Sequence, residues 1–141
     1  LDAAMDGARE AMRSGPQGYP IEDIEVVVTG VDYRADASTP AGEKAAVGEA
    51  LRQAWREAGT RLLEPIMRVE VTSPEANVGD VLGDLNARRA QIEDVGFRGD
   101  QRVITAKVPL RRMFGYSTDL RSATQGRATY SMQFETYDAW E

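Results

Sequence analysis

Neighbouring carboxylates are the first residues of this sequence that could perform chemistry, because two such groups can divide the roles of general acid and general base. Pairs of this kind occur at Glu22–Asp23 and at Glu93–Asp94. The sequence contains no histidine and no cysteine, so the commonest general base and the thiolate metal ligands are both missing. No nucleophile or metal ligand accompanies either pair, and we predict that both are solvated surface without a catalytic or metal-binding role.

Phosphate-binding loops are the second chemical possibility. The loop G-x-x-x-x-G-K-[ST] of many nucleotide hydrolases combines glycines that approach the phosphates with a lysine that contacts them. The two lysines of this chain, Lys44 and Lys107, both lie outside any glycine-rich segment. We therefore expect no nucleotide-hydrolysing activity and no bound cofactor in this chain.

The charge of the chain is acidic and uneven. Residues 1–65 carry 7 basic and 12 acidic side chains, whereas residues 66–141 carry 10 and 11, and the formal net charge of the whole is −6. Neutralisation of phosphates dominates nonspecific binding to nucleic acids, which an acidic chain does poorly. Any contact with RNA is therefore expected to come from local clusters of basic residues.

Residues 1–61 have the pattern of two helices joined by an extended segment. Apolar residues at helical spacing predict a helix over Ala3–Arg13, ended by glycine and proline. Alternation of apolar and polar residues predicts a strand over Ile21–Thr29. After a polar loop, Thr39 and Pro40 have the pattern of a helix cap and first helical residue, so a second helix is expected from Pro40 to about Ala58.

The remaining residues have the order strand, helix, strand, strand, helix, strand. Alternation at Met67, Val69 and Val71 predicts the first strand, and a helix is expected to begin at Ser73–Pro74. The later elements are expected as strands over Ala90–Phe97 and Val103–Val108, a short helix at about Thr118–Thr124, and a last strand through Tyr130, Met132 and Phe134. This order is typical of a split βαβ, ferredoxin-like domain that begins near Leu62.

Four separated motifs are more specific than the packing of such elements requires. The longest reads PLRRMFGYSTDLRSATQGR at Pro109–Arg127, and others lie at Leu63–Val71, Gly79–Arg89 and Ser14–Pro20. In this order they resemble the C-terminal part of the translational GTPase elongation factor G.

The resemblance implies an α+β chain with two parts. Residues 1–61 would be the C-terminal portion of domain IV, an incomplete ribosomal-protein-S5-like βα fragment. Residues 62–141 would be domain V, a ferredoxin-like βαββαβ domain with a four-stranded antiparallel sheet.

The loop at residues 32–38 resembles the tip of domain IV in this family, which enters the decoding centre of the small ribosomal subunit during translocation. The resemblance therefore marks Tyr33, Arg34, Asp36 and Ser38 as candidate contacts with the decoding site. The family usually has a histidine where this chain has Arg34, whose permanent charge also binds phosphate. This departure indicates a divergent paralogue. Considered without the resemblance, the same residues are an ordinary solvated loop.

The resemblance also implies contact with the RNA of the large ribosomal subunit, for which Arg88, Arg89, Arg121 and Arg127 are the candidates. The alternative for Arg88 and Arg89 is a favourable interaction with the C-terminal end of their helix, typically below about 1 kcal/mol each when exposed. The alternative for Arg121 and Arg127 is a structural role within their own segment.

Two aromatic residues of the longest motif could stack on bases. Aromatic side chains beside the start of a helix usually lie in the core, so we predict that Phe114 and Tyr116 are both buried.

The resemblance places GTP hydrolysis outside this chain, in the N-terminal GTPase domains of a longer parent protein that would bind GTP and magnesium. It implies a cytoplasmic protein whose partners are those GTPase domains and the ribosome, through the RNA of both subunits and the stalk-base proteins. No apolar run has the length of a membrane span, and no membrane partner is expected. The strand at Ile21–Thr29 would be without its family partners, so residues 1–60 are predicted to be the less stable half or to pair with another chain.

Three functions remain open from the sequence. The first is translocation of tRNA and mRNA. The second is ribosome recycling or ribosome protection by a paralogue, which the departure at Arg34 motivates. The third, from another class, is a stand-alone ferredoxin-like interaction domain without a ribosomal role, which would require residues 1–61 to fold unaided.

Overall fold

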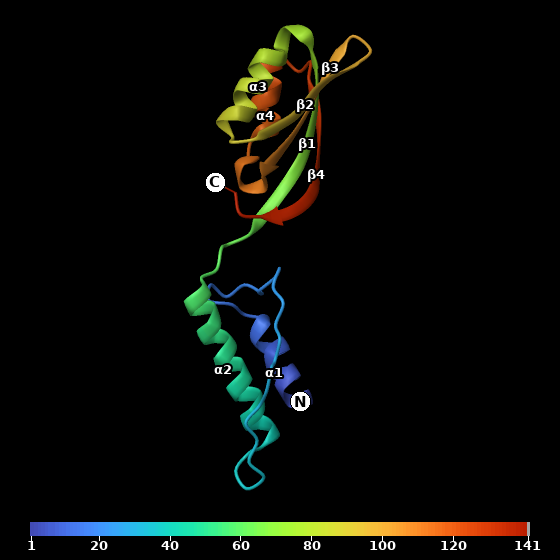
Figure 1. The fold of residues 1–141 in the computed structure, drawn as a ribbon. Coiled ribbons are helices and arrows are strands. Elements are labelled where there is room, and N and C mark those ends of the chain that lie inside the picture. Colours follow the sequence, from blue (N-terminus) through green and yellow to red (C-terminus); the bar gives the residue numbers. More distant parts are fainter. Residues whose placement is uncertain (141) are drawn as a thin grey trace. The chain divides into compact units, whose positions relative to one another are not determined.

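A computed structural model describes residues 1–140 of the chain. The chain forms two compact units, Leu1–Arg61 and Leu62–Glu141 (Figure 1). The first unit contains helices, and the second contains helices and a four-stranded antiparallel sheet. The predicted α+β class is therefore confirmed. None of the helices within residues 1–140 is both long and apolar enough to span a membrane.

The first unit is built on two helices, α1 (Asp2–Met12) and α2 (Pro40–Ala58). Thr39 caps α2 as predicted, because its hydroxyl oxygen accepts a hydrogen bond from the backbone N–H of Gly42 at 3.0 Å. Small residues let the helices approach closely: a Cβ atom added to Gly7 would lie 2.4 Å from the backbone oxygen of Lys44. Trp55 adds the largest buried side chain of α2.

The strand predicted at Ile21–Thr29 is not formed, and that prediction was wrong. Residues 21–29 have no regular secondary structure, and Ile24 and Val27 are exposed. A strand is stable only when its backbone groups pair with a neighbour. Within residues 1–140, the segment finds no such neighbour, and its first residue is held by a hydrogen bond from the N–H of Ile21 to the carbonyl of Met12. The alternating pattern alone is therefore not sufficient to form a strand here.

The second unit has the predicted order of elements. These are β1 (Glu64–Pro74), α3 (Val78–Ala87), β2 (Gln91–Arg98), β3 (Gln101–Pro109), α4 (Tyr116–Thr124) and β4 (Thr129–Asp138). The strands form an antiparallel sheet in the order β2-β3-β1-β4, and both helices lie on one face of it (Figure 1). This is the ferredoxin-like arrangement. Ser73 and Pro74 end β1, and a single 3-10 turn precedes α3, so the helix begins later than predicted.

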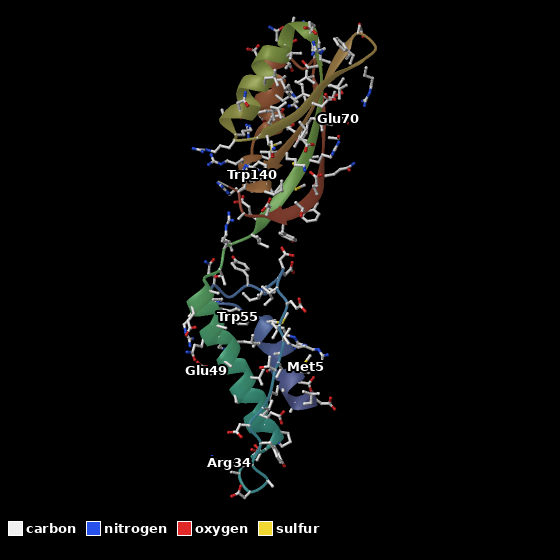
Figure 2. The ribbon with its side chains drawn as sticks, viewed as in Figure 1. Met5, Arg34, Glu49, Trp55, Glu70 and Trp140 are labelled. Atoms are coloured by element: carbon white, nitrogen blue, oxygen red, sulfur yellow. The ribbon has the colours of Figure 1, made fainter. Side chains whose placement is uncertain are left out.

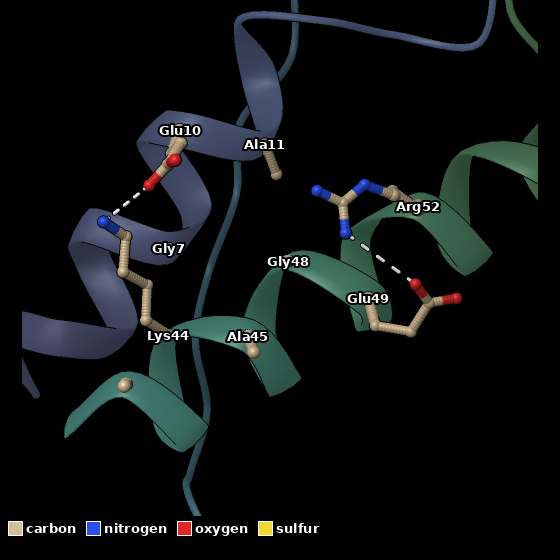
Figure 3. A pocket seen from close by; sticks show the side chains of 9 residues that line it. Gly7, Glu10, Ala11, Lys44, Ala45, Gly48, Glu49 and Arg52 are labelled. Atoms are coloured by element: carbon tan, nitrogen blue, oxygen red, sulfur yellow. Dashed lines mark ion pairs between the residues drawn. The ribbon is translucent and has the colours of Figure 1, made fainter. Parts of the chain in front are cut away.

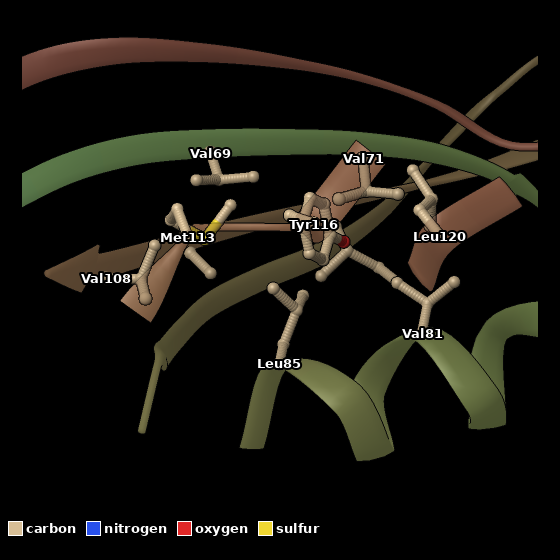
Figure 4. Packing of buried hydrophobic residues seen from close by; sticks show 10 residues of the cluster. Val69, Val71, Val81, Leu85, Val108, Met113, Tyr116 and Leu120 are labelled. Carbon is tan, nitrogen blue, oxygen red and sulfur yellow. The ribbon is translucent and has the colours of Figure 1, made fainter. Parts of the chain in front are cut away.

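The core of the second unit lies between the sheet and its two helices (Figure 4). Alternate residues of the central strands point toward the helices, as the period of a strand requires. The fully buried side chains of the cluster come from every layer and include Val69, Val71, Val81, Leu85, Ile104, Val108 and Tyr116. Because one core holds both helices, the short motifs that carry the candidate arginines are fixed to a rigid support.

The opposite face of the sheet is charged. Arg68 and Lys107 are direct partners in the β1–β3 register, and each lies within 4.0 Å of both Glu93 and Glu135. Both glutamates stand where the register of an edge strand shifts. The pairing with Glu93, with a further contribution from Glu135, raises the pKa of Lys107 above its usual value. Glu93, one of the carboxylates considered for acid–base chemistry, is therefore part of an ion-pair network.

Candidate functional site

The loop that precedes α2 closes on itself through three hydrogen bonds. The N–H of Arg34 donates to the Oγ of Ser38 at 2.8 Å, and the carbonyl of Arg34 accepts from the N–H groups of Ala37 and Ser38 at 3.1 and 2.7 Å. Ser38 thus binds both backbone groups of Arg34. This turn leads directly into the capped start of α2, which anchors one end of the loop.

The side chains of the loop point outward. Tyr33 is 66% exposed, and Arg34 and Asp36 are also exposed. Arg34 lies at the end of the loop in Figure 2, and it makes no side-chain hydrogen bond or ion pair with another residue of the described chain. The structure therefore brings the four predicted tip residues together in one turn, with a free guanidinium and a phenol ring available to a ligand.

The four arginines considered for contact with large-subunit RNA lie in different surroundings. Arg88 follows α3, and its side chain is only 12% exposed. It binds Asp84, Asp119 and two backbone carbonyls. The favourable interaction with the helix end that the sequence suggested is thus a small part of its contacts. Most of its N–H groups are used inside the unit, which leaves little of the guanidinium for an external phosphate.

Arg89, the next residue, has the opposite orientation. It is exposed, and its backbone is left-handed with φ 59°. Glycine is the usual residue in this conformation after a helix, because a Cβ atom is disfavoured there. Its side chain makes no hydrogen bond or ion pair within residues 1–140, and its carbonyl accepts from the Nε1–H of Trp140 at 3.0 Å. Its exposed guanidinium, unpaired within residues 1–140, is therefore accessible to an external anion.

Arg121 and Arg127 lie on α4 and just after it. Arg121 is exposed and forms no side-chain bond to any residue up to Trp140. Arg127 donates from Nε to the carbonyl of Thr124 at 3.2 Å and reaches the Oε1 of Gln125 at 3.4 Å. The start of α4 contacts Arg88, whereas Arg127 follows its end, roughly 13 Å further on for a helix of this length. Arg88, Arg121 and Arg127 therefore lie along the length of α4 and do not form a single cluster.

The prediction for the two aromatic residues was half right. Tyr116 is 1% exposed and packs edge to face on Tyr130 with ring centroids 5.0 Å apart. Burial raises the pKa of the Tyr116 hydroxyl well above its usual range. Phe114, in contrast, is 80% exposed, so its assignment to the core was wrong. The two residues differ because Gly115 between them has φ 75°, which turns the chain before α4 begins.

Sequence reasoning missed a second aromatic feature, at the β2–β3 hairpin. Phe97 is 72% exposed, and the guanidinium of Arg102 lies 4.2 Å from the centre of its ring. Arg102 is also bound to both oxygens of Glu75 at 3.0 and 3.2 Å. Phe97 and Arg102 are partners across the hairpin, and a register counted back from the Gly99 turn could have paired them.

A shallow groove lies between α1 and α2 of the first unit (Figure 3). Its floor is made of small residues, and its rim carries the ion pairs Lys44–Glu10 at 2.6 Å and Arg52–Glu49 at 3.7 Å. The pairing raises the pKa of Lys44 and lowers that of Glu10. Since these charges neutralise one another, the groove has no free group for chemistry. Within residues 1–140, no group of three or more acidic residues is placed to hold a metal ion.

Comparison with known proteins assigns both units to one family. The family model described as elongation factor G, domain IV, matches residues 1–59, and that described as elongation factor G C-terminus matches residues 61–141. Among solved structures, a protein from Thermus thermophilus shares 34% sequence identity with this chain, and its crystal structure matches the chain with a TM-score of 0.83. The match covers 96% of this chain and 21% of that protein, so the chain spans about a fifth of its relative. The matched families are C-terminal ones and are not GTPase domains.

Proposed function

The chain belongs to the elongation factor G family, and from that premise we propose that it is the ribosome-binding C-terminal region of an elongation factor G-like GTPase that promotes translocation of tRNA and mRNA. One observation carries the proposal. In the unit that matches domain IV, Arg34 stands exposed on a turn whose backbone is closed by Ser38. A turn already closed can present a cation to an RNA phosphate with little further loss of conformational entropy.

The second unit would supply the contact with the large subunit. Arg89 and Arg121 are exposed and unpaired within residues 1–140, and they lie on elements held by one core. In the proposed mechanism, the two units bind one state of the ribosome more tightly than another, and this difference in affinity biases the direction of movement. GTP and magnesium would act in further domains of a longer cytoplasmic protein, which would also contact the stalk-base proteins.

The test is a translocation assay with the complete natural polypeptide that carries this sequence. Arg34→Ala is expected to slow single-round translocation about ten-fold, because a hydrogen bond to a charged group contributes about 1.5 kcal/mol or more. Arg34→Lys should retain part of the rate, since it keeps the charge without the bidentate geometry. The matched control is Arg13→Ala, which removes an exposed arginine after α1. Equal rates for Arg34→Ala and wild type would refute the proposed role of the turn.

Recycling of ribosomes is the second candidate function. Arginine cannot switch its charge near neutral pH, whereas the histidine usual at the position of Arg34 can. A protein that splits ribosomal subunits but does not translocate would fit this difference. We therefore expect the protein to be active in only one of two assays, translocation or subunit splitting. Activity in subunit splitting alone would replace the first proposal by the second. A paralogue that protects ribosomes would instead be inactive in both.

The proposal also requires a longer parent protein. An antibody raised against residues 66–141 should detect, in cell extract, a species several-fold heavier than the 15.5 kDa of this chain. A native species of 15.5 kDa would remove the GTPase from the proposal. It would favour a small stand-alone interaction protein with the same fold.

A further inference from the structure

The two adjacent arginines after α3 have different roles, and this difference extends the proposed function, on which it rests. We propose that Arg88 is a positioning residue. It binds the loop at residues 112–115 and the start of α4 to the end of α3, and so fixes the surface that displays Arg89 and Arg121 to RNA.

The guanidinium of Arg88 reaches three separate segments of the second unit. Its Nε donates to the Oδ2 of Asp84 in α3 at 2.9 Å, and its Nη2 donates to the Oδ2 of Asp119 in α4. Its Nη1 donates to the carbonyls of Arg112 and Phe114 at 2.7 and 3.2 Å. One side chain therefore joins α3 to the loop and to α4.

The shape of arginine is essential to this arrangement. The guanidinium is planar and rigid and offers five N–H groups in fixed directions. It also lies over the ring of Tyr116, with its carbon 5.0 Å from the ring centre, where a cation is attracted by the aromatic face. A lysine has one nitrogen on a flexible stem and cannot reach two carboxylates and two carbonyls together.

The segment that Arg88 holds has a single side chain in the core. Met113 is 6% exposed and packs in the core, whereas Phe114 is 80% exposed and is followed by the left-handed Gly115, so Met113 is the apolar anchor of the loop. The 3-10 turn before the loop has no side-chain cap, and neither has the start of α4. The bonds from Arg88 to the carbonyls of Arg112 and Phe114 lie on either side of Met113, so they fix the backbone that its core packing alone leaves free to turn.

Charge-preserving substitution distinguishes positioning from direct contact. If Arg88 touched phosphate, Arg88→Lys would keep part of the affinity that Arg88→Met loses, because the charge remains. If Arg88 positions the surface, Arg88→Lys and Arg88→Met should both weaken binding of the full chain to 70S ribosomes by about five-fold or more, the scale of coupling within one contact network. The control is Arg98→Lys, which alters an exposed arginine of β2 paired with Glu70. We expect it to bind as wild type does.

Hydrogen exchange distinguishes local loosening of the loop from a general loss of stability of the second unit. In Arg88→Lys, the amides of residues 112–119 should exchange faster, while those of β1 and β3 keep wild-type rates. In Arg89→Met, affinity and its salt dependence should fall while loop exchange stays as in wild type.

Four results would overturn the proposal. These are wild-type affinity in Arg88→Lys, unchanged loop exchange in both Arg88 variants, an equal rise of exchange throughout β1 and β3, or no retention of wild type by ribosomes. The last result would refute the proposed function as well, and the first three would leave it intact.

Discussion

Replacement of Arg89 by glycine should give a more stable protein than replacement by alanine, and a weaker ligand of the ribosome than wild type. The backbone of Arg89 is left-handed, with φ 59°. This conformation costs a residue with a Cβ atom about 1–2 kcal/mol, and glycine avoids the cost. Glycine also has more freedom in the unfolded chain, which offsets about 0.5–1 kcal/mol. The net gain expected for Arg89→Gly relative to Arg89→Ala is therefore about 1 kcal/mol.

The alanine variant isolates this effect. Arg89→Ala and Arg89→Gly lose the same charge and the same interaction with the C-terminal end of α3, so their difference in stability reports the backbone alone. Both keep the carbonyl that accepts the hydrogen bond from Trp140. Amide exchange in β3, which is central in the sheet, measures the stability of the second unit. A gain of about 1 kcal/mol slows this exchange about five-fold.

Binding to ribosomes should change in the opposite direction. Loss of one phosphate contact weakens binding and reduces the slope of log affinity against log salt by about one. Both Arg89 variants should show this loss equally. If glycine gives no stability above alanine, the reasoning about backbone strain fails. If the salt slope is unchanged in both variants, Arg89 does not contact phosphate.

Three further changes test the structure itself. Thr39→Ala should destabilise α2 by about 1 kcal/mol through loss of its cap, seen as lower helicity, whereas Thr39→Ser should retain it. Gly7→Ala should separate α1 from α2 and lower the melting temperature of the first unit, because the new Cβ would lie 2.4 Å from the backbone oxygen of Lys44. Gly48→Ala is the control and should be tolerated, because the atom nearest to its new Cβ lies at 3.5 Å. Tyr116→Phe should not destabilise the second unit at neutral pH, since the buried hydroxyl has no hydrogen-bond partner within residues 1–140. Burial raises the pKa of Tyr116 in the folded state above its value of 10.0 in the unfolded chain. The stability of the second unit that depends on the neutral hydroxyl is therefore complete below pH 10.0 and is lost as the pH rises above that value. Tyr116→Phe should therefore lose less stability than wild type between about pH 10 and 12, measured by denaturant titration. Equal losses in the two proteins would contradict the raised pKa of Tyr116.

The sequence alone determined the features that depend on neighbours along the chain. Local patterns predicted the cap at Thr39, the order of elements after Leu62 and the family motifs. They could do so because helical and strand periods and turn residues are properties of neighbouring residues. The antiparallel ferredoxin-like sheet followed from that order, since few topologies join such elements with short connections. The predicted tip residues were placed together by the resemblance of residues 32–38 to the family, and they lie in one turn of the structure.

Only the tertiary structure decided which side chains face outward. Arg88 and Arg89 are adjacent and chemically identical, and the left-handed backbone at Arg89 separates them into one residue bound inside the unit and one exposed to solvent. Phe114 and Tyr116 are separated in the same way by Gly115. The segment at Ile21–Thr29 shows the converse, because its alternating pattern predicted a strand and the structure forms none. Orientation and strand pairing depend on partners distant in the sequence, and no local pattern records whether those partners are present.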